Sequence, residues 1–309
     1  MLQDERNSDV RGRIEVALIG AGIGRSLSPA LHEREGRLLG FDYRYHLYDL
    51  VDLGREPEDI GTLVEQARAD GLRGLNVTHP CKQTVVAALD LLAPEAEALG
   101  AVNTVVFTAE EAVGYNTDWP GFQESFASAL PDAATGQVVV VGAGGAGAAV
   151  AHAILSLDAG HCHVVDSDPA RAQQLVERLR QGFGSERASA LDPARLGDVL
   201  IEADGLIHAT PTGMRDHPGT AVPAEFLHAS LWVAEVVYMP LETQLLRDAR
   251  RAGCRTLDGG GMVAFQAAGS LELFTGVAPD RDRMASHLGE LVAAEREEAR
   301  CEPQSQPSP

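Results

Sequence analysis

The chain has 309 residues, a formal net charge of −20, and a composition that is 45% hydrophobic with 32 glycines, which indicates a globular α/β protein long enough for two domains. The negative charge argues against nucleic acid and anionic membranes as partners, because phosphate groups are bound by basic surfaces. No apolar run approaches the ~20 residues of a membrane span, and the four cysteines form no CxxC pair, so we expect a soluble cytoplasmic protein with reduced thiols.

Strand and helix patterns alternate along the first third of the chain. Short apolar or alternating runs predict strands, and stretches with helical periodicity predict helices. The predicted strands are 14–20, 43–47 and 72–77, and the predicted helices are about 29–39, 60–69 and 84–92. Alternation of this kind with short connections predicts a parallel α/β sheet.

A hairpin and then a second alternating series follow. The hairpin is predicted at 101–107 and 111–115, and a helix beginning within 116–121 is expected to link two domains. From residue 137, five strand-like runs alternate with helical stretches, and 262–274 is predicted to be an apolar helix. The polar residues 1–12 and the charged, then Pro/Ser/Gln-rich residues 295–309 are expected to be disordered.

A glycine-rich turn joins the strand-like run 138–141 to an Ala-rich helix. It consists of Gly142, Ala143, Gly144, Gly145, Ala146 and Gly147 and has the GxGxxG form. Such glycines let the backbone approach a pyrophosphate, and the helix N-terminus supplies N–H donors. Asp166, at the end of the next predicted strand, can accept hydrogen bonds from ribose hydroxyls and would repel a 2′-phosphate. The pattern favours NAD over NADP, with a ligand-free strand–helix packing turn as the alternative.

An earlier glycine cluster, 20–25, also follows a strand but has Arg25 in place of the third motif glycine. It continues into Ser26 and Ser28, which precede Pro29. Two hydroxyls in this place can donate hydrogen bonds to an oxyanion, so we predict a substrate carboxylate site. The alternative is a simple helix N-cap, which would account for Ser28 and leave Ser26 unused.

Lys82 is the only lysine among the 25 Lys and Arg residues of the chain. A lysine can lose its proton when it is desolvated, whereas arginine stays charged and cannot act as a general base. Lys82 is therefore a candidate for proton transfer. The alternative is a surface lysine that remains by chance in an arginine-rich sequence.

Seven motifs occur in one order between residue 14 and about residue 290. They are Ser26-Leu27-Ser28-Pro29, NVTHPCK at 76–82, GAVNT at 100–104, Asn116-Thr117-Asp118, the glycine turn at 142–147, VYMP at 237–240 and GMVAFQA at 261–267. In this order they resemble the shikimate/quinate dehydrogenase family. The run Asp166-Ser167-Asp168 resembles the NAD-using branch of that family, whose NADP-using members commonly carry Asn-Arg-Thr there.

The resemblance implies an α/β fold of two domains with the active site in the cleft between them. The substrate-binding domain would comprise 13–117, with C-terminal helices of 262–294 packing back on it. The Rossmann-type NAD-binding domain would comprise 118–261. His208 stands where asparagine is frequent in the family, beside the cofactor-contacting Thr210, and Ser28 is sometimes threonine in quinate users, which leans the substrate towards shikimate.

The same resemblance implies a role for each matching residue. Lys82 and Asp118 would form the catalytic pair, in which Asp118 positions the amine and binds the reacting hydroxyl. Ser26 and Ser28 would hold the substrate carboxylate. The remaining contacts would be Thr78, Asn103 and Gln266 to the ring hydroxyls, Tyr238 to the substrate, and Thr210 and Gly261, with the glycine turn, to the cofactor.

We therefore predict an NAD-dependent oxidoreductase that interconverts shikimate and 3-dehydroshikimate, and quinate and 3-dehydroquinate. The alternatives are an enzyme acting on aminoshikimate and a non-catalytic sensor of shikimate-like acids. The expected partner is a small cyclic hydroxy acid, and a homodimer is the oligomer under consideration. No metal is assigned, because His161 and His163 share a strand face without a third ligand.

Overall fold

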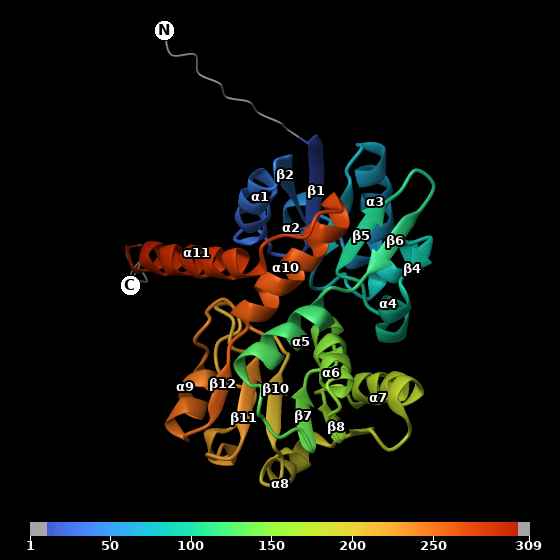
Figure 1. Ribbon diagram of the computed structural model, residues 1–309. Helices are drawn as coiled ribbons and strands as arrows, with labels where there is room; N and C mark the ends of the chain where they lie inside the picture. Colours follow the sequence, from blue (N-terminus) through green and yellow to red (C-terminus); the bar gives the residue numbers. More distant parts are fainter. Residues whose placement is uncertain (1–10, 302–309) are drawn as a thin grey trace, which may run out of the picture.

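Two six-stranded sheets organise the computed structural model, which describes residues 11–301. In Figure 1 the sheet from the first part of the chain lies above the sheet from the second part. Two long helices, α5 (Asp118–Ala129) and α10 (Gly260–Thr275), cross between them. The α/β class predicted from the sequence is confirmed.

The first sheet is mixed rather than fully parallel. Its strands are β1 (Arg13–Gly20), β2 (Asp42–Asp49), β3 (Gly74–Val77), β4 (Leu91–Leu92), β5 (Thr104–Phe107) and β6 (Ala112–Tyr115). They lie in the order β2-β1-β3-β5-β6-β4. The predicted hairpin of β5 and β6 is confirmed, and the pairing of β5 with β3 is also antiparallel. The prediction of a parallel sheet is therefore right for β1, β2 and β3 and wrong for β5.

Short helices connect these strands. They are α1 (Ser28–Leu38), α2 (Leu50–Leu53), α3 (Ile60–Ala69) and α4 (Pro94–Leu99), with 3₁₀ helices at Pro57–Asp59 and Thr84–Ala88. The predicted helix at 84–92 is wrong beyond Ala88, where the chain turns into β4. The β-branched run Thr84, Val85 and Val86 is a poor α-helix former, and the N–H of Asp90 donates to the carbonyl of Ala112 at the sheet edge.

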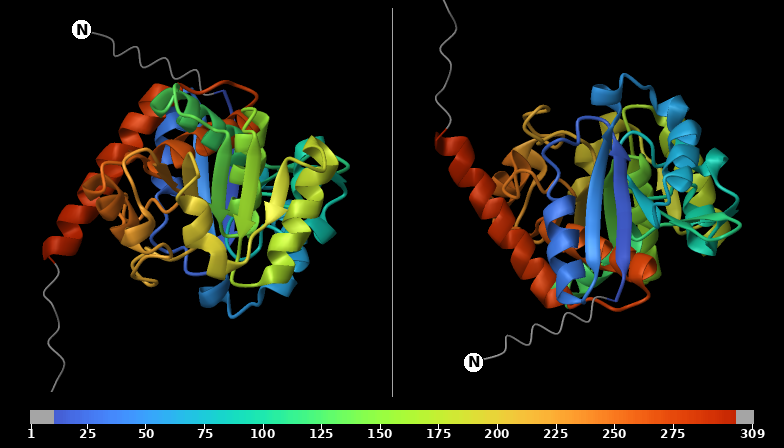
Figure 2. Two further views of the ribbon diagram at one scale, coloured as in Figure 1. Left: turned by 90° about the horizontal axis from the view of Figure 1, so that it is seen from below. Right: turned by 90° about the horizontal axis from the view of Figure 1, so that it is seen from above.

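The second sheet is parallel throughout. Its strands are β7 (Gln137–Val141), β8 (His161–Val165), β9 (Ala188–Ala190), β10 (Gly205–His208), β11 (Trp232–Glu235) and β12 (Arg255–Leu257). The order β12-β11-β10-β7-β8-β9 is that of the doubly wound dinucleotide-binding fold. Its helices flank both faces of the sheet in Figure 2. They are α6 (Gly145–Ser156), α7 (Pro169–Phe183), α8 (Leu196–Leu200) and α9 (Gln244–Arg251), with 3₁₀ helices at Pro193–Arg195 and Ala224–Phe226.

The close approach of α5 and α10 depends on a glycine. A Cβ atom at Gly121 would lie 2.7 Å from the backbone nitrogen of Gln266 and 3.0 Å from the carbonyl oxygen of Met262. Contacts this short require backbone to shift, so a larger residue would push the two helices apart. The helices carry Asp118 and Gln266, and their separation therefore determines how these side chains meet.

The chain ends on α11 (Arg281–Cys301), which lies beside α1 and α10 (Figures 1 and 2). Leu31 of α1, Ala264 and Ala268 of α10, and Met284 and Leu288 of α11 share one buried cluster.

Part of the predicted terminal disorder is wrong. Residues 295–301 continue α11, and residues 11–12 make backbone hydrogen bonds with Gly40 and Asp42. Residues 1–10 and 302–309, for which disorder was also predicted, lie outside the described residues. The division into domains at 117/118 and 261/262 stays a prediction.

Candidate active site

Lys82 and Asp118 meet between the two sheets. Lys82 lies in the turn after β3, and Asp118 is the first residue of α5. The Lys82 Nζ atom is 2.6 Å from Asp118 Oδ2, with exposed fractions of 18% and 6% for the two side chains. The pair predicted as catalytic is thus a direct ion pair, shielded from most of the solvent yet reachable through the lysine.

Asn116 places Asp118 at this point. Its Oδ1 atom accepts the backbone N–H of Asp118 at 3.0 Å, and its Nδ2 atom donates to the carbonyl of Ala101 at 2.9 Å. An asparagine that bonds its own backbone two residues on is a standard way to begin a turn or helix. The Asn-Thr-Asp motif therefore directs the aspartate towards the loop that carries Lys82.

Asn103 connects the pair to its neighbours. Its Nδ2 atom donates to Asp118 Oδ1 and to Thr117 Oγ1, both at 2.9 Å, and lies 3.3 Å from Gln266 Oε1. Its Oδ1 atom accepts from the backbone N–H of Thr117 at 2.8 Å. The structure thus brings together four of the predicted site residues, Lys82, Asp118, Asn103 and Gln266.

A buried chain of polar side chains leads away from Asn103. Thr104 Oγ1 donates to Asn103 Oδ1 at 3.0 Å and accepts from Asn76 Nδ2 at 3.2 Å. The hydroxyl of Tyr45 donates to Asn76 Oδ1 at 2.9 Å. Sequence reasoning assigned no role to Tyr45, Asn76 or Thr104, because each lies on a strand pattern that also indicates ordinary sheet packing.

The predicted serine pair lies at the Tyr45 end of this series of hydrogen-bonded side chains. Ser28 lies within reach of side-chain hydrogen bonding with Tyr45, and Ser26 with Tyr238. Burial raises the pKa of both tyrosines, and these hydrogen bonds lower it part of the way back. The two phenols therefore stay protonated and can orient the serine hydroxyls.

The alternative reading of Ser28 as a helix cap is wrong. Leu27 is the N-cap of α1 and carries no side-chain capping bond. Ser26 is not unused, because its Oγ atom accepts the backbone N–H of Ser28 at 3.3 Å. Thr78 lies beside the same loop, with its methyl group against Gly20 and its backbone N–H bonded to the carbonyl of Ile19.

The first glycine cluster is closed by a carboxylate of its own chain. Asp49, at the end of β2, accepts the N–H groups of Gly22 at 2.9 Å and Ile23 at 2.7 Å. These are donors that a bound pyrophosphate would need. The loop is therefore not a dinucleotide turn, in agreement with the sequence-based interpretation.

The second glycine turn fits a dinucleotide. Gly142 has a φ of +109°, and a Cβ atom there would lie 2.6 Å from the carbonyl oxygen of Ala209, so only glycine suits this position. Space is open beside Gly144, the N-cap of α6, which has no side-chain cap. The first turn of α6 thus presents N–H donors and the positive end of the helix dipole.

The same turn adjoins the lysine and the predicted acidic residue. A Cβ atom at Gly145 would lie 3.0 Å from Cβ of Lys82, which puts the predicted cofactor turn directly against the predicted catalytic pair. Asp166 Oδ2 accepts the N–H of Ala143 at 2.7 Å. Thr210 packs against Gly142, whereas Gly261 packs against Ser125 of α5, so the glycine at 261 has a packing reason of its own.

Burial and then the positive charge of Lys82 lower the pKa of His79, three residues before it. His79 is therefore neutral near pH 7 and adds no competing charge. His161 and His163, the two histidines on one strand face to which no metal was assigned, both hydrogen-bond with Ser189 on the second sheet. Within residues 11–301 no group of three or more His, Cys, Asp or Glu side chains could hold a metal ion.

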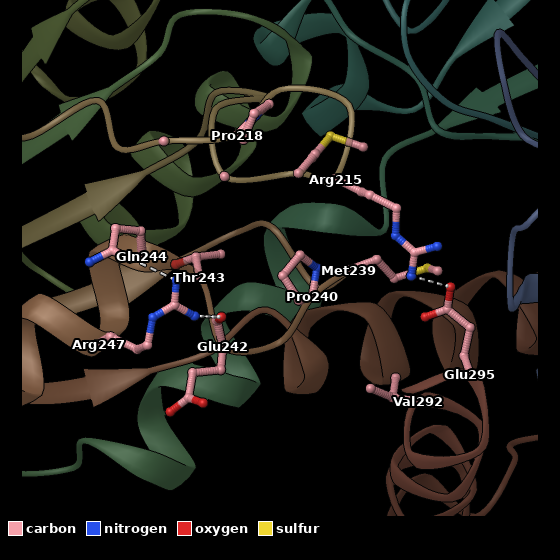
Figure 3. Close-up of a pocket in the computed structure, with 13 residues that line it drawn as sticks. Arg215, Pro218, Met239, Pro240, Glu242, Thr243, Gln244, Arg247, Val292 and Glu295 are labelled. Atoms are coloured by element: carbon pink, nitrogen blue, oxygen red, sulfur yellow. Dashed lines mark hydrogen bonds and ion pairs between the residues drawn. The ribbon is translucent and has the colours of Figure 1, made fainter. Parts of the chain in front are cut away.

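A groove opens between the second sheet and α11 (Figure 3), lined in part by Met239, the residue after Tyr238. Its walls include Met214 and Arg215 from the loop after β10, Met239 from the turn after β11, and Val292 from α11. Arg215 pairs with Glu295 of α11 at 3.0 Å across the groove. Sequence reasoning missed this contact because it placed Glu295 in a disordered tail.

Known proteins resemble the chain over most of its length. Residues 18–105 match the family model described as "Shikimate dehydrogenase substrate binding domain". The "Shikimate dehydrogenase (NADP(+))" of Streptomyces avermitilis is 60% identical over 277 residues, which cover 90% of this chain and 95% of the relative. The chain belongs to the shikimate dehydrogenase family.

Other family members differ in the cofactor that their names carry. The "Quinate/shikimate dehydrogenase (NAD(+))" of Corynebacterium efficiens is 44% identical over 272 residues, which cover 88% of this chain and 96% of the relative. The structure "Quinate dehydrogenase from Corynebacterium glutamicum in complex with NAD" has a TM-score of 0.84 and 42% identity, covering 90% of this chain and 99% of that one. The family and a nicotinamide cofactor are thus supported, while its relatives include both NAD- and NADP-named shikimate dehydrogenases.

Among the helices of residues 11–301, none combines the length and the apolar character that a membrane span requires. Cys81, Cys162 and Cys254 are free and buried. Both findings concern the described part of the chain.

Proposed function

We propose that the protein oxidises shikimate to 3-dehydroshikimate, and quinate to 3-dehydroquinate, with NAD as the oxidant, and catalyses the reverse reductions. The observation that carries the proposal is the 2.6 Å contact of Lys82 with Asp118, directly beside the first turn of α6. A proton-transfer pair and a dinucleotide turn at one point are what an alcohol dehydrogenation requires.

Lys82 moves the proton of the reacting hydroxyl. In the oxidation, the neutral amine accepts this proton as the O–H bond breaks and the C=O bond forms, and in the reduction the ammonium returns it. When bound, the nicotinamide accepts or donates the hydride. Asp118 Oδ2 holds the amine in place, and Asp118 Oδ1 is held in turn by Asn103.

The remaining site residues orient the substrate. The protein carries a net charge of −20, which repels an anionic acid, so local donors must bind its carboxylate. Ser26 and Ser28 fit that role, because each lies beside a buried, protonated tyrosine, Tyr238 and Tyr45 respectively, that can orient its hydroxyl. Thr78, Asn103 and Gln266 would pair with ring hydroxyls, and buried polar groups of this kind reject analogues that lack them.

Asp166 supports NAD as the preferred cofactor. Its carboxylate lies at the glycine turn, bonded to the N–H of Ala143, and Asp168 follows with its own N–H on Asp166 Oδ1. Two carboxylates here would repel a 2′-phosphate. Arg171 is the nearest following cation in the sequence, and its Nε atom already lies 3.7 Å from Asp168.

Initial rates with shikimate, quinate and aminoshikimate, each with NAD and with NADP, test the proposal. We expect reduced NAD to form with shikimate and quinate. A preference for aminoshikimate would favour the amino-analogue enzyme, and binding of shikimate without turnover would favour the sensor. A strong preference for NADP would refute the role given to Asp166 without affecting that of Lys82.

The remaining expectations are a cytoplasmic location and a homodimer. The free cysteines at 81, 162 and 254 support the first. Light scattering of the purified full chain tests the second, and a monomeric mass at working concentration would contradict it.

A further inference from the structure

A buried histidine–carboxylate pair lies at the carboxyl edge of the second sheet, outside the proton-transfer machinery. His208 is the last residue of β10 and Glu235 the last of β11, with exposed fractions of 1% and 2%. His208 Nδ1 is 2.8 Å from Glu235 Oε1. Carboxylates accept hydrogen bonds and do not donate them when ionised, so Nδ1 carries the proton of this contact.

Glu235 is fully engaged by donors. Oε1 also accepts the backbone N–H of Val237 at 3.0 Å, and Oε2 accepts the hydroxyl of Thr243 at 3.0 Å. Val237 precedes Tyr238, and Thr243 is the N-cap of α9. The carboxylate therefore anchors both ends of the turn that presents Tyr238 and Met239; Figure 3 shows Thr243 and Met239 at the groove.

His208 reaches the opposite loop with its second nitrogen. Its Nε2 atom is 2.6 Å from Thr210 Oγ1. The same Oγ1 accepts the backbone N–H of Thr212 at 3.2 Å. Thr210 stands against the glycine turn, since a Cβ atom at Gly142 would lie 3.0 Å from its methyl carbon. His208 thus holds the hydroxyl of Thr210, a residue whose methyl group lies against the turn where the dinucleotide would lie.

We infer that His208 and Glu235 form one positioning unit. It orients Thr210 at the cofactor site and holds in place the turn that presents Tyr238 to the substrate. The inference rests on the proposed function, because it takes the turn at 142–147 as the cofactor site. Burying a histidine and a carboxylate without water costs free energy that apolar residues in the same places would avoid. Here the cost is offset by the hydrogen bond within the pair and by three more, to Thr210, to the backbone N–H of Val237 and to Thr243, which lie in the loops after β10 and β11.

His208 and Glu235 touch neither the reacting atoms nor Lys82, so they act through Thr210 and Tyr238. The two members are therefore expected to differ in effect. Loss of His208 releases Thr210 alone, whereas loss of charge on Glu235 also loosens the Tyr238 turn.

The first test compares His208→Asn, Thr210→Val and the double variant in the full-length enzyme. Asparagine keeps a short amide donor for Glu235 but does not span the distance to Thr210, and valine keeps the shape of threonine without its hydroxyl. We expect each single variant to raise KM for the cofactor about threefold to tenfold, the effect of one lost hydrogen bond. KM for shikimate and kcat at saturating cofactor should stay within about twofold, and the double variant should equal the singles.

His228→Asn is the matched control. His228 lies in the same sheet domain with both ring nitrogens bonded, to Ser230 and to the carbonyl of Leu200, but before β11, at the opposite edge. This variant is expected to change the melting temperature without changing either KM. Should His208→Asn prove too unstable to purify, Glu235→Gln decides the matter, with KM expected to rise for both cofactor and shikimate.

The possible outcomes distinguish failure of the positioning unit from failure of the proposed function. A normal cofactor KM in His208→Asn together with a raised KM in Thr210→Val would overturn the positioning unit and leave the cofactor site standing. Additive effects in the double variant would overturn it as well, and so would a raised cofactor KM alone in Glu235→Gln. A normal KM in Thr210→Val would remove Thr210 from the cofactor site, and absence of any turnover by the wild type would refute the proposed function itself.

Discussion

Replacement of Lys82 by arginine tests whether the site needs a titratable amine or only a positive charge. The Lys82 Nζ atom is 2.6 Å from Asp118 Oδ2, and the lysine side chain is 18% exposed. An arginine here would keep a cation beside the carboxylate, and its first methylene groups can follow the lysine stem past Gly145. Arginine does not release its proton in proteins, so it can neither accept the substrate proton nor return it.

We expect kcat to fall by about 10²- to 10⁴-fold, the range that a positioned acid–base group contributes. That loss corresponds to about 2.7–5.4 kcal/mol in the barrier. KM for shikimate should change by less than about threefold, because the charge that faces the substrate is kept and only an interaction of the transition state is lost.

The assay is the initial rate of cofactor reduction at saturating shikimate, with the melting temperature measured beside it. Arg13→Lys, a swap in an exposed pair with Glu15, is the control and should leave both quantities unchanged. A folded Lys82→Arg enzyme that keeps kcat within about threefold of the wild type would refute proton transfer by the amine.

Three further predictions concern packing, pH and the groove. Gly121→Ala should lower the free energy of unfolding by about 1–3 kcal/mol and also lower kcat, because its Cβ atom would lie 2.7 Å from the backbone nitrogen of Gln266. Burial lowers the pKa of His32 from 6.5 to about 3, so the unfolded chain takes up this proton first and stability falls as the pH drops from 6.5 to 3. His32→Leu should therefore flatten that fall by up to about 1.4 kcal/mol per pH unit. Arg215→Ala should cost less than about 1 kcal/mol of stability, since Arg215 is half exposed in its pair with Glu295, and should speed product release by opening the groove that this pair spans.

Each of these has a measurement and a contrary result. For Gly121→Ala, chemical denaturation and kcat are compared with Gly289→Ala, where a Cβ atom meets nothing within 4 Å; equal effects of the two would contradict the packing argument. For His32→Leu, denaturation at several pH values should yield a smaller slope, and parallel curves would exclude His32 as the source. For Arg215→Ala, burst-phase kinetics report product release, and an unchanged steady-state rate with a normal burst would rule out closure by this pair.

Features that depend on neighbours in the sequence could be predicted from it. The turn at 142–147 and the turn at 20–25 could be told apart because the third motif position is Gly147 in one and Arg25 in the other. The structure adds the reason, since Asp49 occupies the donors of the first loop. The proximity of Lys82 to Asp118 was implied by family resemblance rather than by spacing, as the two are 36 residues apart.

Features that depend on competition between local propensity and packing were predicted less well. The run at 84–92 is not helical to its end, because Leu91 and Leu92 form β4 and pair with β6 at the edge of the first sheet. The tail at 295–301 is helical, as its Ala- and Glu-rich composition allows, and its side chain at Glu295 is held by Arg215. Composition alone favoured disorder there, because it contains no information about a partner 80 residues earlier.

The sequence by itself determined the class of fold, and it predicted the nucleotide turn and the proton-transfer role of Lys82, since each prediction starts from a short run of residues. Only the tertiary structure decided which side chains hold these groups in place. Tyr45 of β2 and Asn76 of β3 are bonded to each other with β1 between their strands, and His208 meets Glu235 only because β10 and β11 are parallel neighbours that end together. Such contacts follow from strand order and register, which bring distant residues to one edge of a sheet, and no local pattern in the chain specifies them.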